Sequence, residues 1–159
     1  MTPNENPSRI LLVCTGNTCR SPMAAAWFNR LAAAARAPWR AESAGVNAVP
    51  DQPMTTQARL ALLQAGLTEA PPHRSRMLDG TLAHGAARIL TMTGAHRREV
   101  LRRCPDLAGQ VSTLAEAAGD TGDIPDPFGG DVGEYAECLA RMIPLLERVL
   151  ERLVREGGA

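Results

Sequence analysis

The residues of this sequence with the clearest potential for chemistry are Cys14 and Arg20, which lie six positions apart in the segment Cys-Thr-Gly-Asn-Thr-Cys-Arg-Ser. The apolar run Ile10–Val13 before them is typical of a buried strand. Ser21-Pro22 after them is typical of a helix start, because proline fits the first turn of a helix. Loop N–H groups and a helix N-terminus then converge on one point, where they favour an anion. The Cys14–Ser21 loop is therefore predicted to be an anion cradle.

A cysteine at the bottom of such a cradle is expected to be present largely as the thiolate, because the helix dipole and the loop amides stabilise negative charge. The planar guanidinium of Arg20 suits two oxygens of a tetrahedral oxyanion. A thiolate that faces a bound phosphate group invites in-line attack on phosphorus and a cysteinyl-phosphate intermediate. The alternative is a buried, inert cysteine. The strand, loop and helix start around Cys14 favour catalysis.

The interior of the loop contains residue types that a tight turn requires. Gly16 and Asn17 adopt positive φ at least cost, and the Asn17 side chain is able to brace the loop. Ser21 is expected to donate a hydrogen bond to the Cys14 thiolate or to cap the helix, and the two roles are compatible. Cys19 is close enough to form a disulfide with Cys14 if the loop flexes, which predicts a reversible oxidative shut-off. The alternative for Cys19 is a small packed residue.

Composition narrows the class of protein. The chain is 45% hydrophobic and 21% charged, which fits one globular domain over residues 1–159, with residues 1–8 as a flexible extension. Its 17 cations, all arginine, balance 17 acidic residues, so no basic field indicates nucleic acid. No apolar segment is long enough to span a bilayer or has the order of a signal peptide. The four cysteines show no disulfide-scaffold spacing, so we expect a reduced, cytoplasmic protein with no membrane contact.

The rest of the chain alternates between predicted strands and helices. We expect further strands over 39–43, 87–92 and 110–114, and helices over 22–36, 55–64, 79–85, 95–103 and 132–155. The Gly-, Asp- and Pro-rich stretch 119–133 is expected to be exposed and mobile unless it is tied down. This alternation implies a parallel sheet covered on both faces, and ligands bind such sheets beyond the carboxyl ends of the strands. The Cys14–Ser21 loop lies at that end of the first strand.

Residues 13–24, Val-Cys-Thr-Gly-Asn-Thr-Cys-Arg-Ser-Pro-Met-Ala, resemble the phosphate loop of the low-molecular-weight protein tyrosine phosphatases. Ser43-Ala44-Gly45, Asp126-Pro127 and the helix that follows extend the likeness over nearly the whole chain. The resemblance implies a flavodoxin-like three-layer α/β fold, with a four-stranded parallel sheet and helices on both faces. It also implies that Cys14 is the nucleophile, Arg20 the phosphate clamp and Asp126 the general acid, which later acts as the base for hydrolysis.

The resemblance assigns supporting roles as well. The phosphate is implied to lie against the loop residues Thr15, Gly16, Asn17, Thr18, Cys19 and Arg20. Positions that brace the loop in relatives are matched by Asn17, Ser21, Ser43 and His73, and an exposed loop histidine is the alternative for His73. No metal or cofactor is implied, since Arg20 and the loop amides already neutralise the phosphate.

Several other residues of the sequence also carry side chains that are capable of acid–base or thiol chemistry. Asp123 and Asp131 compete with Asp126 within the same stretch, and the resemblance rather than the spacing selects Asp126. The histidines His84 and His96 match no functional position and are predicted to be surface residues. The remaining cysteines, Cys104 and Cys138, are predicted to be inert.

Thr18 discriminates between substrates, because tyrosine phosphatases of this fold commonly carry a larger aliphatic residue there. The segment Thr-Gly-Asn-Thr-Cys-Arg-Ser-Pro-Met-Ala instead resembles the bacterial protein-arginine phosphatases. Asp126-Pro127-Phe128-Gly129-Gly130 points the same way, because the tyrosine enzymes tend to show an aromatic pair after Asp-Pro. Asn47 departs from the aromatic residue expected in the arginine enzymes. With only 3% aromatic residues, Phe128 is left as the main pocket wall, which favours phosphoarginine over the alternative, phosphotyrosine.

Two other kinds of protein are alternatives to a phosphatase for this sequence. A thioredoxin-coupled arsenate reductase shares the fold and the Cys-x5-Arg loop, but it needs a further cysteine pair near the third strand. Residues 74–103 contain no cysteine, and Pro22 stands where such reductases tend to carry Gln. A pseudoenzyme that only binds is disfavoured, because Cys14, Arg20 and Asp126 are all present. The expected partners are phosphorylated protein substrates, and the sequence does not determine the oligomeric state.

Overall fold

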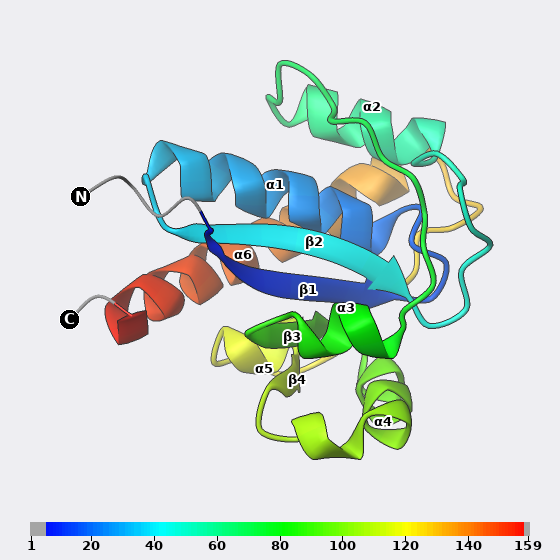
Figure 1. The fold of residues 1–159 in the computed structure, drawn as a ribbon. Coiled ribbons are helices and arrows are strands. Elements are labelled where there is room, and N and C mark those ends of the chain that lie inside the picture. The colour runs from blue at the N-terminus through cyan, green and yellow to red at the C-terminus, as the bar shows by residue number, and fades with distance from the viewer. Residues whose placement is uncertain (1–5, 158–159) are drawn as a thin grey trace.

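The computed structural model describes residues 6–157 and contains one four-stranded sheet in the order β2-β1-β3-β4, in which all neighbours are parallel (Figure 1). The strands are β1 (Ser8–Cys14), β2 (Trp39–Gly45), β3 (Arg88–Thr91) and β4 (Val111–Thr113). The first strand lies inside the sheet, so its carboxyl end is flanked by the ends of β2 and β3. This is the flavodoxin-like α/β arrangement that the sequence predicts.

Helices cover both faces of the sheet. They are α1 (Arg20–Ala34), α2 (Thr56–Gln64), α3 (Gly80–His84), α4 (Gly94–Arg103), the 3-10 helix η1 (Pro105–Leu107), α5 (Leu114–Ala117) and α6 (Val132–Gly157). Residues of β1 alternate between two hydrophobic clusters: Ile10 and Leu12 pack with α1, α2, α5 and α6, whereas Leu11 and Val13 pack with α3, α4 and η1. Burial of both faces of a strand is characteristic of a parallel sheet.

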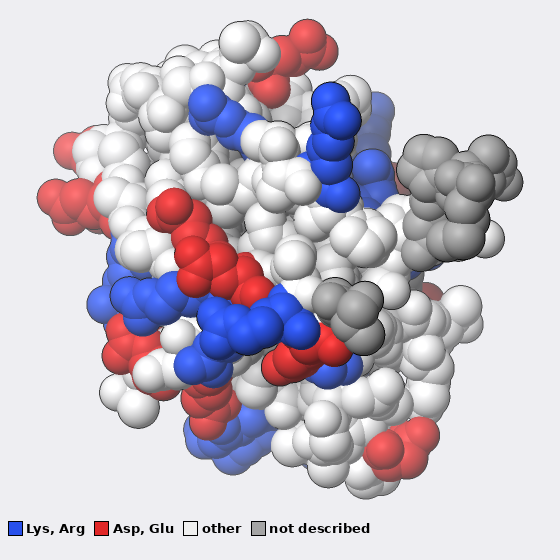
Figure 2. Space-filling model, turned by 90° about the vertical axis from the view of Figure 1, so that its left-hand side faces the viewer, with Lys and Arg blue, Asp and Glu red and all other residues white. Residues whose placement is uncertain are grey.

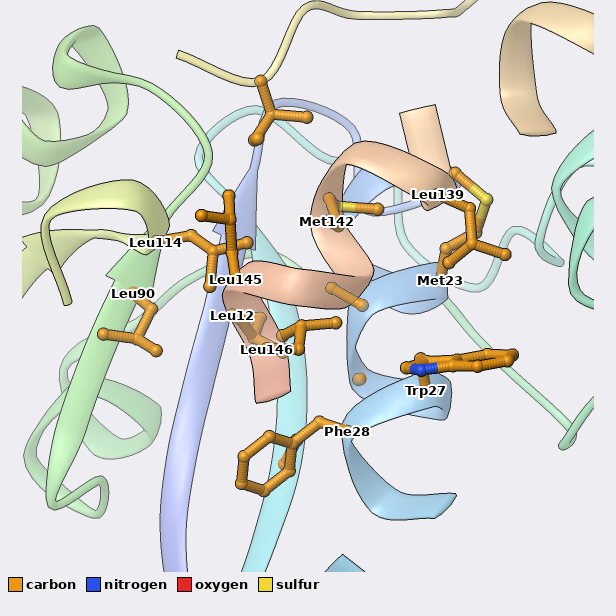
Figure 3. Packing of buried hydrophobic residues seen from close by; sticks show 14 of the residues in the cluster. Leu12, Met23, Trp27, Phe28, Leu90, Leu114, Leu139, Met142, Leu145 and Leu146 are labelled. Atoms are coloured by element: carbon orange, nitrogen blue, oxygen red, sulfur yellow. The ribbon is translucent and has the colours of Figure 1, made fainter. Parts of the chain in front are cut away.

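The larger cluster fixes α1 and α6 against one face of the sheet. Phe28 of α1 and Leu146 of α6 are fully buried and lie beside Leu12 of β1 (Figure 3). Each such side chain contributes about 1.5–3 kcal/mol through burial of apolar area. Because α1 starts directly after the Cys14–Ser21 loop, this packing also fixes the position at which the loop ends.

Two short helices were not predicted from the sequence. The strand expected over 110–114 ends at Thr113, because Thr113 and Glu116 form a capping box. The Thr113 hydroxyl accepts from the Glu116 N–H at 3.0 Å, and the Glu116 carboxylate accepts from the Thr113 N–H at 2.8 Å. Leu114 is therefore the first residue of α5 rather than the last of a strand. The 3-10 helix η1 follows the predicted stop of α4 at Cys104-Pro105.

The ends of the first two elements also differ from expectation. Residues 1–5 of the predicted N-terminal extension lie outside the described residues, and Ser8 belongs to β1, where its N–H donates to the Pro38 carbonyl at 3.0 Å. Helix α1 begins at Arg20 rather than at Pro22. The guanidinium of Arg20 therefore extends from the first residue of a helix, whose backbone direction is fixed by the turns that follow.

The stretch 119–131 is tied down at its centre, which is the exception that the prediction of an exposed, mobile loop allowed. Ile124 is fully buried, and its N–H donates to the Met92 carbonyl at 2.9 Å. Asp123 accepts from the Gly94 N–H at 2.9 Å. Both contacts join the loop to the carboxyl end of β3 and the start of α4, so the stretch lies over the carboxyl edge of the sheet.

Among residues 6–157, no helix is both long and apolar enough to cross a bilayer. On the face at the amino ends of the strands, arginine and acidic side chains are intermixed (Figure 2). Ion pairs there include Arg9 with Glu42 at 3.3 Å and Arg88 with Glu156 at 3.3 Å.

Candidate active site

The Cys14–Ser21 loop is held by the ends of the neighbouring strands. Cys14 is the last residue of β1 and is paired in register with Gly45, the last residue of β2. The Cys14 carbonyl accepts from the Val46 N–H and the Thr15 carbonyl from the Asn47 N–H, both at 2.9 Å. These bonds occupy the first two carbonyls of the loop, so its backbone is fixed on the β2 side.

Gly45 is required by the close approach of the loop. A Cβ at this position would collide with the Thr15 carbonyl oxygen and would lie 3.1 Å from the Asn17 backbone nitrogen. Gly16, in contrast, is not in the positive-φ region, and a Cβ there would find only the Thr18 hydroxyl, at 3.8 Å. The expectation that Gly16 supplies a positive φ is therefore wrong, because Asn17 alone makes the left-handed turn.

Asn17 adopts φ 58° and is fully buried. Its side-chain amide donates to the Ser21 hydroxyl at 2.9 Å, and its side-chain oxygen accepts from the Arg76 N–H at 3.0 Å. Its backbone carbonyl lies 2.6 Å from Nε2 of His73. Since a carbonyl only accepts, Nε2 of His73 carries the proton. These bonds tie Asn17 to Ser21 within the loop and to the segment that contains His73 and Arg76.

Ser21 links this brace to the sulfur of Cys14. Its hydroxyl oxygen accepts from Asn17 and lies 2.9 Å from Sγ of Cys14, in a fully buried setting. Because Asn17 supplies a hydrogen to the oxygen, the hydroxyl hydrogen is free to point at the sulfur. The Ser21 hydroxyl is therefore placed to donate a hydrogen bond to Sγ of Cys14.

Of the two other residues predicted to brace the loop, His73 contacts it directly and Ser43 acts through Arg76. His73 is half-buried rather than exposed, and burial lowers its pKa, so it contacts Asn17 as the neutral imidazole. Ser43 is buried, but its contact is made by its backbone carbonyl, which accepts from Nε of Arg76 at 3.0 Å. Arg76 in turn donates its backbone N–H to Asn17. Ser43 therefore supports the segment that braces the loop rather than the loop itself.

Arg20 is almost completely buried, with 4% of its surface exposed. One terminal nitrogen donates to the Ile124 carbonyl at 2.9 Å, and the other lies 3.4 Å from both the Thr15 hydroxyl and the Asp126 carboxylate. Nε of Arg20 is buried and has no partner among residues 6–157. A buried, unpaired N–H is costly. A phosphate oxygen in the cradle would satisfy that donor.

The structure separates the three aspartates of the 119–133 stretch. Asp126 is the one beside the loop, and its other oxygen accepts from the Phe128 N–H at 3.0 Å. Asp123 accepts from the first N–H of α4, and Asp131 accepts from the Glu134 N–H at the start of α6 at 2.9 Å. Asp123 and Asp131 therefore satisfy helix N-termini, and Asp126 is the one of the three that contacts the Cys14–Ser21 loop.

Cys19 lies inside the loop, with 6% of its surface exposed. Burial, and then the charges of Cys14 and Asp126, raise the pKa of its thiol to about 12. Its sulfur is 3.8 Å from the Asp126 carboxylate. All four cysteines are free thiols in the structure. Cys19 therefore rests as the thiol.

Cys138 and Cys104 are also buried, on opposite faces of the sheet. Cys138 belongs to the cluster around α1 and α6, whereas Cys104 belongs to the cluster around α4. Burial raises the pKa of Cys138 to about 11, and its sulfur lies 3.9 Å from the Pro125 carbonyl. The two thiols lie in separate clusters and are not a pair.

The residues predicted to set specificity come from the loop itself and from the segment that follows Asp126. Thr18 is half-buried, and its carbonyl accepts from the Thr55 N–H at 2.9 Å, at the start of α2. Phe128 follows Asp126 on the other side and is 70% exposed. Of the other aromatic side chains, Trp27, Phe28 and Tyr135 are buried in the core, and Trp39 is the first residue of β2.

The prediction that His96 is a surface residue is wrong. It is 7% exposed, and its Nε2 lies 2.8 Å from the Thr15 hydroxyl. Burial, and then the charge of Arg20, lower the pKa of His96 to about 4. His84 is a surface residue as predicted and pairs with Asp106 at 2.8 Å.

Sequence reasoning missed four contributors to this site: Gly45, Arg76, the carbonyl of Ile124, and His96. The motif Ser43-Ala44-Gly45 marks a strand end but not a close approach of two backbones. Arg76 and Ile124 act through backbone groups, which leave no signal in residue type. The buried state of His96 follows from the sheet order, because α4 starts beside the end of β1.

Residues 6–157 contain no group of three or more His, Cys, Asp or Glu side chains that is arranged to hold a metal ion.

Comparison with known proteins gives consistent matches over the chain. A family model described as "Low molecular weight phosphotyrosine protein phosphatase" matches residues 9–158. A protein-arginine-phosphatase of Geobacillus stearothermophilus is 38% identical over 151 residues, which cover 94% of this chain and 99% of that protein.

Solved structures agree with that match. A low molecular weight protein tyrosine phosphatase from T. tengcongensis superposes with a TM-score of 0.88 at 34% identity, covering 91% of this chain and 99% of that one. A cysteine-to-serine mutant of a YwlE arginine phosphatase with a phosphorylated active-site serine superposes with a TM-score of 0.87 at 35% identity, covering 91% and 95% of the two chains.

The close approach at Gly45 predicts the effect of a single methyl group. Gly45→Ala should displace the Thr15 carbonyl and the loop with it, destabilising the protein by about 1–3 kcal/mol. The same displacement should reduce kcat/KM for p-nitrophenyl phosphate by at least about tenfold, because catalysis tolerates little misplacement. Urea unfolding and steady-state kinetics measure the two effects.

Gly109→Ala is the matched control, because a Cβ at Gly109 meets nothing within 4 Å. It should leave kcat/KM unchanged. Wild-type kinetics in Gly45→Ala would show that the loop does not depend on this contact.

Proposed function

The chain belongs to the low molecular weight phosphotyrosine protein phosphatase family and is a phosphatase. We propose that it hydrolyses phosphorylated protein side chains, phosphoarginine in particular, through a phosphate group carried on Cys14. The observation that carries the proposal is the arrangement around one point of a Ser21-bonded cysteine, a buried arginine with a free Nε, and the Asp126 carboxylate. These are the nucleophile, the clamp and the acid that phosphoryl transfer requires.

In the first step, the Cys14 thiolate attacks phosphorus while Arg20 holds the phosphate oxygens. The bond from phosphorus to the leaving atom breaks as the bond from sulfur to phosphorus forms. Asp126, in its protonated form, gives its proton to the leaving oxygen or nitrogen. Arg20 is fixed by the Ile124 carbonyl before substrate binds, so its charge is preorganised for the transition state.

In the second step, water attacks the phosphate on Cys14 and gives a proton to the Asp126 carboxylate. The sulfur leaves as a thiolate, which the Ser21 hydroxyl stabilises through its contact at 2.9 Å. The relative that has a phosphorylated active-site serine supports this course, because its phosphoryl group is carried on an active-site side chain. No metal enters either step, because the Arg20 guanidinium and the loop amides supply the positive charge.

The choice of phosphoarginine rests on the walls of the site. A phosphotyrosine ring is expected to stack on aromatic side chains. Phe128 is the one exposed aromatic residue beside Asp126, and the other rings are in the core or at the far end of β2. Thr18 would add a narrow, polar wall, which suits a guanidinium, and the Asp126 carboxyl would hydrogen-bond to that group and give it a proton. Phosphotyrosine is the second candidate, since a tyrosine phosphatase relative is 34% identical to this chain.

A redox guard is part of the same proposal. Peroxide would oxidise the Cys14 thiolate to a sulfenic acid, and Cys19 would displace water from it to form a disulfide. The high pKa of Cys19 keeps it protonated in the reduced enzyme. Conversion of Cys14 to a neutral sulfenic acid removes one of the charges that raise this pKa, so Cys19 becomes easier to ionise when it is needed.

Arsenate reductase chemistry is not supported. The relatives described above are phosphatases. Cys104 and Cys138 lie on opposite faces of the sheet, in separate hydrophobic clusters, so they cannot relay a disulfide to each other.

Asp126→Asn tests the acid. The substitution should lower kcat on a phosphoarginine peptide by about 100-fold or more, the range of general acid catalysis. It should lower kcat on p-nitrophenyl phosphate less, because p-nitrophenolate leaves without a proton. Asp131→Asn is the matched control in the same loop, since asparagine also caps a helix. Equal losses on the two substrates would exclude Asp126 as the proton donor.

Thr18→Ile tests the substrate assignment. With purified wild-type protein, kcat/KM should be higher for a phosphoarginine peptide than for the matched phosphotyrosine peptide. Thr18→Ile should shift the ratio of the two constants toward phosphotyrosine, because the side chain at this wall loses its hydroxyl and becomes larger and apolar. Thr18→Val separates loss of the hydroxyl from gain of bulk. A wild-type preference for phosphotyrosine, or a ratio that Thr18→Ile leaves unchanged, would refute the phosphoarginine assignment.

A further inference from the structure

His96 reaches the Cys14–Ser21 loop from the other side of the sheet. It is the third residue of α4, which starts at the carboxyl end of β3, next to the end of β1. We propose that His96 is a positioning residue, which holds the Thr15 hydroxyl and through it the Arg20 guanidinium in the place that phosphate requires. This inference rests on the proposed function of the loop, and it adds a contact from α4 to the bracing by Asn17 and Ser21.

The contacts form a short relay. Nε2 of His96 lies 2.8 Å from the Thr15 hydroxyl, and the same hydroxyl lies 3.4 Å from a terminal nitrogen of Arg20. Among residues 6–157, His96 and Arg20 are the two side chains within hydrogen-bond distance of that hydroxyl. The contact to Arg20 is long and therefore weak. Without His96, the Thr15 side chain would be free to rotate and the contact to Arg20 would be lost.

Arg20 needs this third support. The nitrogen that faces Thr15 also faces the Asp126 carboxylate at 3.4 Å, and Asp126 is half-exposed on its loop. A guanidinium held only by the Ile124 carbonyl and Asp126 would follow the carboxylate when it turns to the leaving group. The Thr15 hydroxyl gives the guanidinium a fixed neighbour within the loop itself, so its plane stays aligned with the bound phosphate.

The proton of His96 is expected on Nε2. Its Nδ1 is buried and has no hydrogen-bond partner among the described residues. A proton on Nδ1 would be an orphaned buried donor, which native structures rarely tolerate. With the proton on Nε2, the Thr15 oxygen accepts from His96 and from Arg20, one with each lone pair. The imidazole is neutral, because burial and the nearby charge of Arg20 disfavour the imidazolium.

A purely structural role for His96 accounts less well for the site. The start of α4 is capped by Thr93, whose hydroxyl accepts from the His96 backbone N–H at 3.1 Å. That bond is available to any residue at position 96. The imidazole is not required to cap the helix, and its one polar contact with residues 6–157 is directed at the loop.

The test measures binding of inorganic phosphate by titration calorimetry, which needs no turnover. His96→Leu replaces the imidazole, and with it the donor, by an apolar side chain of similar size. It should weaken phosphate binding about tenfold, which is the loss expected when a hydrogen bond that supports a charged group is removed. His96→Gln carries an amide that can reach the position of Nε2, and it should restore most of the affinity. Thr15→Val removes the same bond from its other end and should match His96→Leu, and the double variant should lose no more than either single variant.

Two further measurements complete the test. Nitrogen-15 NMR of the wild-type imidazole at pH 7 should show Nε2 protonated and Nδ1 unprotonated. His84→Leu, which changes an exposed histidine far from the loop, should bind phosphate as the wild type does. Wild-type phosphate affinity in His96→Leu, failure of Gln to improve on Leu, or a proton on Nδ1 would overturn the role of His96. A wild-type protein that binds phosphate but cleaves no phosphorylated peptide would instead contradict the proposed function.

Discussion

The left-handed turn at the buried Asn17 is the constraint on which the rest of the site depends. A non-glycine residue at φ 58° costs free energy, although asparagine tolerates this region better than most residues. The cost is offset by three hydrogen bonds, to Ser21, Arg76 and His73, each worth about 0.5–1.5 kcal/mol. The turn brings the end of β1 and the start of α1 together, so that Cys14 and Arg20 face one point. Gly45 gives the turn the room it needs beside β2.

Arg20 connects this loop to the rest of the carboxyl edge of the sheet. Because it is the first residue of α1, the packing of that helix against α6 determines where its side chain starts. The Ile124 carbonyl then directs the guanidinium, and Ile124 is itself bonded to Met92 at the end of β3. The bond between Ile124 and Met92 therefore also fixes the position of the Arg20 guanidinium. Asp126 lies two residues beyond the anchor, at the point where the stretch becomes exposed.

Much of this architecture is predictable from the sequence, because it follows from local patterns. The apolar strand, the Cys-x5-Arg spacing and the Ser-Pro start predict the loop, and alternating strands and helices predict the parallel sheet. The missed features depend on contacts between distant segments. His96 matches no functional position in the resemblance, which is why the sequence predicts a surface residue, and only the sheet order brings the first turn of α4 beside β1. The pattern that predicts a strand over 110–114 does not reveal the capping box between Thr113 and Glu116, which ends the strand and makes Leu114 the first residue of α5.

The central claim is that catalysis passes through a phosphate group on Cys14. The most direct measurement mixes the enzyme with p-nitrophenyl phosphate, quenches it within the first turnover, and maps the phosphorylated residue by mass spectrometry under conditions that preserve thiophosphate. We expect one phosphoryl group, on the peptide that contains Cys14, and none in Cys14→Ala. Phosphate on another residue, or turnover of p-nitrophenyl phosphate in Cys14→Ala at the wild-type rate, would contradict it.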